Sequence, residues 1–191
     1  MAGPPDAPTP GAAARPPRWL AAAVAVVVAA VVLAVVLVAR GGSGSGDVQV
    51  AGSAPRVGQP PPQFSGTTLD GRRFDLGAER GRVVLVNFFA TWCHNCREEL
   101  PLLERTYRQR HAGGLDVVTV DFNDGGDARA FLAPYDISFP AMLDPASRVG
   151  HAYLVTDLPV SFFVGRDGRL AQAFHGQLSQ DTISAALAPL L

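Results

Sequence analysis

Residues 83–101 read VVLVNFFATWCHNCREELP, and this stretch decides the fold. Its first seven residues are β-branched, aromatic or aliphatic except for Asn87, a composition that predicts a buried central strand. Beyond the two cysteines, apolar residues recur at helical spacing as far as Tyr107, which predicts a helix, and Pro101 inside it predicts a kink near its middle. The CxxC pair therefore lies at the junction of a buried strand and the helix that follows it.

The elements predicted around this stretch alternate between strands and helices. Asp70-Gly71 between two short alternating segments predicts a hairpin with a type I′ turn. A second buried strand is expected over 115–122, and a helix over 127–135 that Asp127 caps. Further elements are a short strand over 139–143, a short helix over 147–153, a hairpin with strands over 160–164 and 169–174, and a closing helix over 179–190 that Ser179 caps. The order βαβα followed by ββα predicts an α/β fold, a three-layer sandwich with a mixed sheet.

Apolar residues are concentrated near the N-terminus. Residues 19–39 form a run of 21 residues without a charge, amide or hydroxyl, which is long enough for one transmembrane helix. We expect a signal anchor over 18–40. A cleaved signal peptide is the alternative, although its apolar core usually has about 7–15 residues. Arg15 and Arg18 precede the run and Arg40 alone follows it closely, so the positive-inside rule predicts a cytoplasmic N-terminus and a single-pass cell-membrane protein with its domain on the extracytoplasmic side.

Three further segments are distinguished by composition. Residues 1–17 are rich in proline and small residues and predict a disordered cytoplasmic tail. Residues 41–63 begin with GGSGSG and end near three consecutive prolines, which predicts a flexible linker. Residues 64–191 are sufficient for a single domain.

Charge and cysteine content exclude several functions. The formal net charge of -1 gives no field for binding nucleic acid. All 16 basic residues are arginine, which excludes Schiff-base lysine chemistry and a P-loop lysine. With 2 cysteines the chain cannot build a disulfide-rich scaffold.

The position of the cysteines favours redox chemistry. At a helix N-terminus the free amide groups and the helix dipole stabilise a thiolate, which is the nucleophile in disulfide exchange. We expect Cys93 to be the exposed attacking thiol and Cys96 the more buried resolving thiol. His94, when protonated, is expected to lower the pKa of Cys93 further.

Two other uses of a CxxC pair are weaker alternatives. A structural zinc site needs two more ligands, and the scattered residues His111, His151 and His175 show no paired spacing, so we expect no metal. A purely structural disulfide would close so small a loop that it removes little entropy from the unfolded chain.

The same stretch, together with LPVSFFV at 158–164 and the turn at 166–168, resembles the thioredoxin-like proteins of the TlpA/ResA type. The resemblance covers essentially all of 57–191. It implies a thioredoxin-like sandwich preceded by a single transmembrane helix, and a membrane-anchored thiol-disulfide oxidoreductase that acts outside the cytoplasm without a cofactor. It further implies exported protein thiols and disulfides as partners, apocytochrome c among them, and a CcdA-like membrane electron donor for cytochrome c maturation.

The resemblance also implies roles for individual residues. Pro159 matches a cis-proline that faces the CxxC and holds the substrate chain, with an ordinary strand-start proline as the alternative. Glu99 matches an acidic residue that moves protons for the resolving cysteine, and a solvated helix glutamate is the alternative. Trp92 matches an aromatic residue at the substrate side, or simply packs. Asn87 stands where classical thioredoxins have a buried aspartate.

Two departures from the family pattern leave the redox direction open. Asn95 precedes the second cysteine where proline is usual, and Leu158 precedes Pro159 where a small or β-branched residue is frequent. A peroxiredoxin-like peroxidase is one alternative function, although Ala90 and Val86 stand where those enzymes commonly have hydroxyl and proline residues. A redox-inactive binding module is another, although both cysteines are present.

Overall fold

The computed structural model describes residue 28, residues 30–31 and residues 48–191. The chain divides into two units, Met1–Gly44 and Ser45–Leu191. The predicted tail over 1–17 and most of the predicted span over 18–40 lie outside the described residues. Within the described residues, no helix has both the length and the apolar content needed to cross a bilayer.

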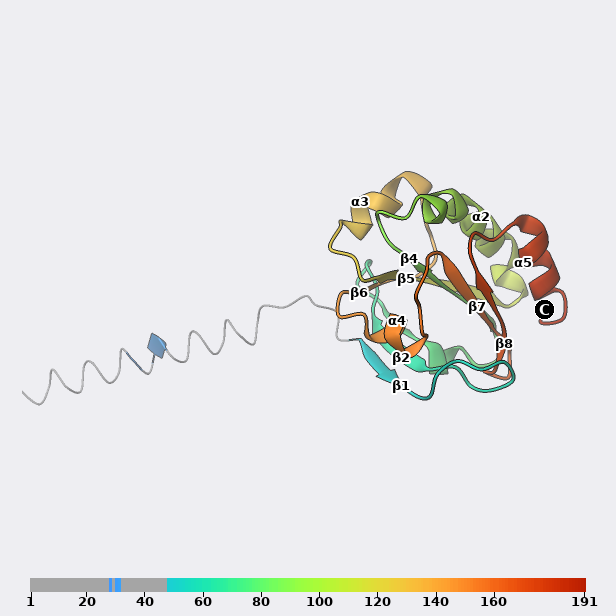
Figure 1. The fold of residues 1–191 in the computed structure, drawn as a ribbon, viewed down its shortest axis with the longest axis horizontal. Coiled ribbons are helices and arrows are strands. Elements are labelled where there is room, and N and C mark those ends of the chain that lie inside the picture. The colour runs from blue at the N-terminus through green and yellow to red at the C-terminus, as the bar shows by residue number, and fades with distance from the viewer. Residues whose placement is uncertain (1–27, 29, 32–47) are drawn as a thin grey trace, which may run out of the picture. The chain divides into compact units, whose positions relative to one another are not determined.

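A mixed sheet forms the centre of the second unit (Figure 1). Its strand order is β6 (Ala141–Asp144), β5 (Leu115–Phe122), β4 (Val83–Phe89), β7 (Val160–Val164) and β8 (Leu170–His175). The first three strands are parallel, and the last two run antiparallel to their neighbours. Every residue of β4 is buried, as expected for a central strand with both faces covered.

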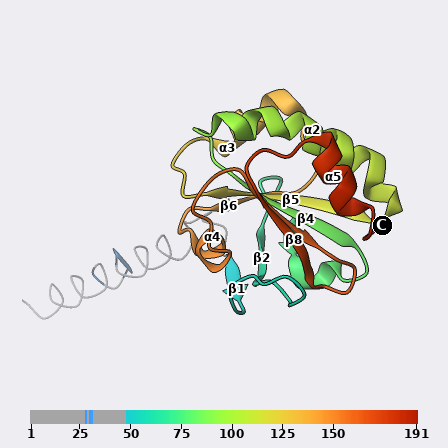
Figure 2. The ribbon, with the colours of Figure 1, turned by 45° about the vertical axis from the view of Figure 1, so that its right-hand side comes forward.

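Two layers cover the sheet (Figures 1 and 2). One layer consists of α2 (His94–Arg110), α3 (Ala128–Leu132) and α5 (Gln180–Leu187). The other consists of α4 (Arg148–Ala152) and a smaller antiparallel sheet of β1 (Gln49–Ala51), β2 (Gln63–Thr67) and β3 (Arg73–Asp75). Short 3-10 helices, η1 (Leu76–Glu79), η2 (His111–Gly113) and η3 (Ala133–Tyr135), connect these elements. The predicted three-layer α/β sandwich with a mixed sheet is confirmed.

Most local predictions agree with the structure. Asp127 and Ser179 are the N-caps of α3 and α5, and their side chains accept backbone amides at 3.0 and 3.1 Å. The prediction of a type I′ turn at Asp70-Gly71 is wrong. The loop between β2 and β3 runs over 68–72, and Gly71 has φ +85° whereas Asp70 is not in the left-handed region. The Asp70 carboxylate instead accepts the Thr68 hydroxyl, which closes a longer loop.

The expectation of a flexible linker over 41–63 is wrong for its described residues, 48–63. Val48 is buried, and β1 pairs with β2. Pro61 and Pro62 are buried as well, and the Tyr153 hydroxyl donates a hydrogen bond to the Pro62 carbonyl at 2.8 Å. Within the described residues, the packed domain therefore already includes Val48 and does not begin at residue 64.

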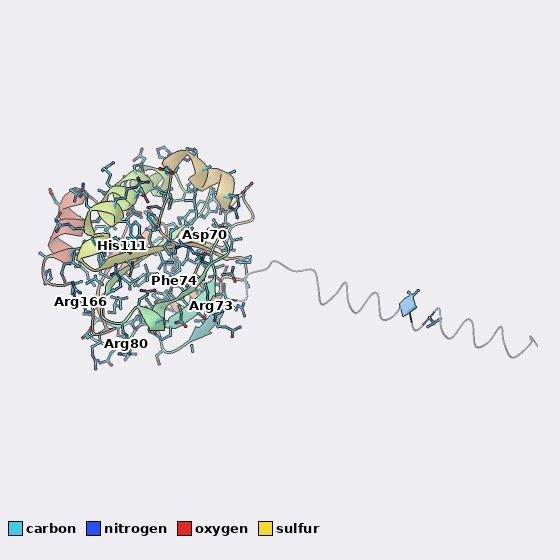
Figure 3. The ribbon with its side chains drawn as sticks, turned by 180° about the vertical axis from the view of Figure 1, so that it is seen from behind. Asp70, Arg73, Phe74, Arg80, His111 and Arg166 are labelled. Atoms are coloured by element: carbon cyan, nitrogen blue, oxygen red, sulfur yellow. A yellow bond between two sulfur atoms is a disulfide. The ribbon has the colours of Figure 1, made fainter. Side chains whose placement is uncertain are left out.

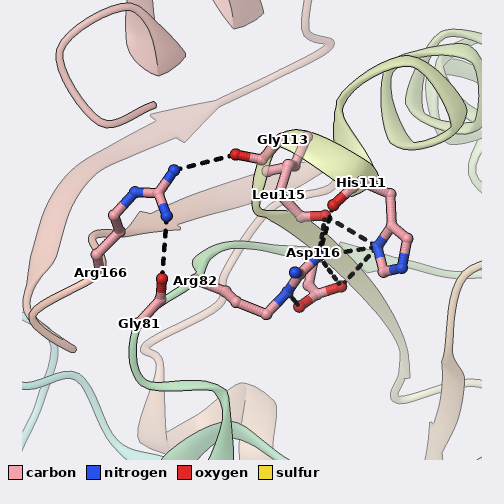
Figure 4. Close-up of polar contacts among 7 residues, drawn as sticks. All are labelled: Gly81, Arg82, His111, Gly113, Leu115, Asp116 and Arg166. Carbon is pink, nitrogen blue, oxygen red and sulfur yellow. Dashed lines mark hydrogen bonds and ion pairs between the residues drawn. The ribbon is translucent and has the colours of Figure 1, made fainter.

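A cluster of polar side chains closes one end of the sheet (Figures 3 and 4). Arg82, just before β4, forms a two-pronged ion pair with Asp116 of β5 and donates to the His111 carbonyl at 2.8 Å. His111 Nδ1 lies 2.9 Å from the same carboxylate. Arg166 donates to the carbonyls of Gly81 and Gly113 at 3.1 and 3.0 Å. These contacts hold the amino ends of β4 and β5, which leaves the carboxyl ends for the cysteines.

Candidate redox site

The two cysteines form a disulfide at the start of α2. Cys93 is the N-cap, with φ -80° and ψ 110°, and its Sγ accepts the Cys96 amide at 3.1 Å. A sulfur in this position satisfies one of the amides that a helix leaves unpaired at its first turn. The geometry places Cys93 where a thiolate is stabilised by both a hydrogen bond and the helix dipole.

The burial of the cysteines differs in part from expectation. Cys96 is 1% exposed and Cys93 is 5% exposed, so the order is as predicted but Cys93 is not an exposed thiol. In the disulfide both residues belong to the hydrophobic cluster between the sheet and α2. Trp92, directly before Cys93, is 67% exposed and provides the accessible apolar surface at the site.

Glu99 lies in the interior, and it is not a solvated helix glutamate. Glu99 is 1% exposed. Its carboxylate accepts hydrogen bonds from the Leu178 backbone amide at 2.7 Å and from the Asn87 side-chain amide at 2.9 Å. Burial raises the pKa of Glu99 to about 7, although the hydrogen bonds from Leu178 and Asn87 oppose the shift. A carboxyl group in this state gains and loses a proton near neutral pH.

The sheet supplies one hydrogen-bond partner of Glu99, the Asn87 side chain. Asn87 of β4 lies opposite Thr119 of β5 and Ser161 of β7, so the three side chains share the face covered by α2. The Thr119 hydroxyl donates to Asn87 Oδ1 at 2.9 Å, and Asn87 Nδ2 lies 3.1 Å from the Ser161 hydroxyl. Glu99 follows Cys96 by three positions, so both lie on the buried face of the helix. The buried carboxyl therefore comes from the helix, and the strand carries a neutral amide.

The other predicted site residues lie around this centre. The Leu158-Pro159 peptide bond is cis, as the resemblance implied. Val160 pairs with Phe88, so Pro159 lies beside the carboxyl end of β4, where the chain turns toward Cys93. His94 Nε2 lies 3.2 Å from a Glu98 carboxylate oxygen, and its side chain is 79% exposed. The influence of His94 on Cys93 stays a prediction.

Sequence reasoning missed a pair of carboxyl groups near the cysteines, those of Asp121 and Asp124. The Asp124 carboxylate accepts the amide of Thr91, two residues before Cys93, and Asp121 at the end of β5 is buried behind it. The sequence signal was the polar residues Thr119 and Asp121 at alternate positions of a strand whose other residues, apart from Asp116, are apolar. Within the described residues, no group of three or more His, Cys, Asp or Glu side chains is placed to hold a metal ion.

Comparisons with known proteins agree with this geometry. The model of the AhpC/TSA family matches residues 57–173. The thiol-disulfide oxidoreductase ResA of Bacillus cereus (strain ZK / E33L) is 28% identical over 133 residues, which cover 69% of this chain and 77% of that protein. The thioredoxin-like protein YneN of Bacillus subtilis (strain 168) is 32% identical, covering 68% and 78%. The structure of a thiol:disulfide interchange protein of the thioredoxin family from Chlorobium tepidum TLS superposes with a TM-score of 0.64 at 26% identity, covering 73% of this chain and 99% of that one.

Proposed function

The chain belongs to the AhpC/TSA family and is a thioredoxin-like thiol-disulfide oxidoreductase, and from this premise we propose that it exchanges electrons with exported protein thiols through Cys93 and Cys96. The observation that carries the proposal is the disulfide at the N-cap of α2, one turn from the buried carboxyl of Glu99.

The exchange proceeds in two displacement steps. In the reduced enzyme the Cys93 thiolate attacks a substrate disulfide, forming a mixed disulfide and releasing one substrate thiolate. Cys96 then loses its proton to the Glu99 carboxylate, and its thiolate attacks Cys93 Sγ. This step forms the Cys93–Cys96 disulfide and releases the second substrate thiolate. Two electrons pass to the substrate, and the reverse sequence oxidises a substrate dithiol.

The buried position of Glu99 supports its role as the base. A thiol in an apolar site resists ionisation, and a neighbouring carboxyl with a pKa of about 7 can accept its proton at neutral pH. Asn87 and Leu178 hold the carboxyl in place without adding a charge. Pro159 and Trp92 would hold the extended chain of the substrate beside Cys93.

We further propose that the domain acts on the extracytoplasmic side of the cell membrane, anchored by residues 18–40. The apolar run over 19–39 and the arginines that precede it support this placement. Because disulfides persist outside the cytoplasm, a reductant there needs electrons delivered through the membrane, for which a CcdA-like protein is the candidate donor. Apocytochrome c is the candidate target, by resemblance to the ResA type.

The function is tested with the full chain in an insulin-reduction assay with dithiothreitol. Cys93→Ser should abolish exchange, because it removes the attacking thiol. Cys96→Ser should accumulate mixed disulfides with substrate, visible on non-reducing gels and lost on reduction. If Cys96→Ser forms no adduct while the wild type exchanges normally, the assigned roles of the two thiols are wrong. Consumption of peroxide without insulin reduction would indicate a peroxidase, and inactivity in both assays a binding module.

The redox direction is decided by equilibrating Cys93 and Cys96 with a glutathione series. A reduction potential well below that of the glutathione couple supports a reductase, as cytochrome c maturation requires. A potential above it supports an oxidase or isomerase, and would remove apocytochrome c as the target.

A further inference from the structure

The turn that leads into Cys93 is held by the loop that follows β5. Thr91 donates its backbone amide to the carboxylate of Asp124, 33 positions away, and the other carboxylate oxygen accepts the Gly126 amide at 2.9 Å. A Cβ atom at Gly126 would lie 2.1 Å from Thr91 Oγ1, so the loop packs against Thr91 as closely as a residue without a side chain allows. The position of Thr91 is therefore fixed by the loop over 123–126.

Asp121 is the buried neighbour of Asp124. It is 3% exposed and pairs in register with Phe89, the last residue of β4. Its Oδ1 has no hydrogen-bond partner within the described part of the chain, while its carboxyl group is hydrogen-bonded to that of Asp124. A buried, incompletely paired carboxylate is costly, so the neutral acid is the favoured form of Asp121.

The neighbouring charges favour one proton between the two carboxyls. Burial, followed by the charge and hydrogen bond of Asp124 and the charge of Asp144, raises the pKa of Asp121 to about 7. Burial also acts on Asp124, but hydrogen bonds from Thr91, Gly126 and Asp121 outweigh it and lower the pKa of Asp124. Below about pH 7, Asp121 is thus the protonated donor and Asp124 the carboxylate that accepts.

Other charged groups around the pair have partners of their own. Asp144, at the end of β6, accepts the amides of Arg148 and Gly150 at 2.8 and 2.9 Å. On the α2 side, the Arg97 guanidinium lies 5.2 Å from the centre of the Phe131 ring, and that ring stacks on Phe89. Asp144 has the same sign of charge as Asp121, and Arg97 lies over the Phe131 ring, so neither group offsets the charge of an ionised Asp121. The change with pH that we consider is therefore the loss of the Asp121 proton.

We propose that Asp124, supported by the protonated acid of Asp121, is a positioning residue for thiol-disulfide exchange. By holding the Thr91 amide it fixes Cys93 at the N-cap of α2, where the Cys96 amide stabilises the Cys93 sulfur. When Asp121 loses its proton, Asp124 loses a donor and faces a like charge, so the hold on Thr91 loosens. The proposal rests on the proposed exchange function and adds to it a carboxyl pair that does not contact the sulfurs.

The first test is the pH profile of Cys93 alkylation by iodoacetamide in the reduced full chain. Asp124→Ala removes the acceptor of the Thr91 amide and should slow alkylation at pH 7 about fivefold, the factor that corresponds to one net hydrogen bond. The midpoint of the profile should move to higher pH. Asp124→Asn keeps one acceptor oxygen and should recover most of the rate.

Asp127→Asn is the matched control. It removes a charge three positions after Asp124, and the Asn side-chain oxygen can still cap α3. It should alkylate like the wild type. If the Asp124 carboxylate only supported the fold, its removal in Asp124→Ala would lower the free energy of unfolding without moving the alkylation midpoint. If Asp124→Ala and Asp127→Asn give the same profile, the proposal is overturned.

The second test reads the Thr91 amide directly by ¹⁵N–¹H NMR. In the wild type and in Glu99→Gln its chemical shift should change with a midpoint near pH 7, and in Asp121→Asn, which keeps a donor but cannot ionise, this change should vanish. If the pH-dependent shift of the Thr91 amide vanishes in Glu99→Gln and persists in Asp121→Asn, the proposal is overturned. Failure of the exchange function is a separate result, since it appears as absent insulin reduction by the wild type while the Thr91 titration remains.

Discussion

Asn87 donates its side-chain amide to the Glu99 carboxylate across 2.9 Å in the interior of the domain. A neutral donor leaves the carboxyl free to gain or lose a proton, because no fixed positive charge holds it ionised. The Thr119 hydroxyl donates to Asn87 Oδ1 and the Ser161 hydroxyl accepts from Nδ2, which keeps an N–H of Nδ2 directed at an oxygen of Glu99 in both protonation states. Asn87 therefore supports both states of Glu99.

Glu99→Gln should change how stability depends on pH. The folded-state pKa of about 7 lies above the ordinary value of 4.5, so the folded chain binds more protons between these values. The favourable contribution of the neutral acid is fully present below pH 4.5 and is lost as the pH rises through 7, with a total of about 3 kcal/mol. Urea unfolding at pH 4.5 and pH 8 should show a smaller difference in Glu99→Gln than in the wild type. An unchanged difference would contradict the assignment.

Asn87→Asp should move the pH profile of exchange upward. The substitution places a second carboxyl at hydrogen-bond distance from Glu99, so the pair shares one proton and one apparent pKa rises by about one unit or more. The measurement is the rate of mixed-disulfide resolution against pH. Gln172→Glu adds the same charge at an exposed position of β8 and should leave the midpoint in place. Equal profiles for the two variants would show that Asn87 is not coupled to the base.

Tyr153→Phe should test whether the segment before β2 belongs to the folded domain. The variant leaves the buried Pro62 carbonyl without its donor and should lower the free energy of unfolding by about 1–3 kcal/mol. Tyr135→Phe is the control, because that ring is only partly buried, and it should stay within about 0.5 kcal/mol of the wild type. Denaturant unfolding measures both. Equal stabilities would mean that the Pro62 contact contributes nothing.

Asp116→Asn should destabilise the end of the sheet far from the cysteines. The Asp116 side chain is 14% exposed and contacts both Arg82 and His111, so its loss leaves Arg82 without its ion-pair partner, at a cost of about 1–3 kcal/mol. Arg72→Gln breaks an exposed ion pair and should change stability by less than about 1 kcal/mol. Both variants should reduce insulin at the wild-type rate. A loss of exchange in Asp116→Asn at a temperature where it is folded would contradict the separation of the two ends.

Elements with a strong pattern were predictable from the sequence, and the reasons are local. The nearly continuous apolar run of β4 has few alternatives to a buried strand, and Cys93, four positions beyond its end, could be placed at a helix start. By contrast, β1 has three residues within a segment rich in glycine, serine and proline. Such a short strand shows no periodicity and exists through pairing with β2.

The interior of the site was less predictable because its contacts are distant in sequence. Glu99 shares the helical face of Cys96 and Leu103, a spacing that placed it inward, while its charge suggested solvent. Asp124 meets Thr91 because the parallel pairing of β4 with β5 brings Phe89 beside Asp121. No local pattern reports that register, so the carboxyl pair emerged from the structure.

The early start of the folded domain also bears on where the chain can be shortened for experiment. Val48 is buried, and β1 pairs with β2. A fragment that began at residue 64 would lose β1, together with the Pro62 carbonyl that accepts the Tyr153 hydroxyl, and would expose the apolar cluster to which Val48 and Phe64 belong. A cut at that point would therefore remove part of the fold.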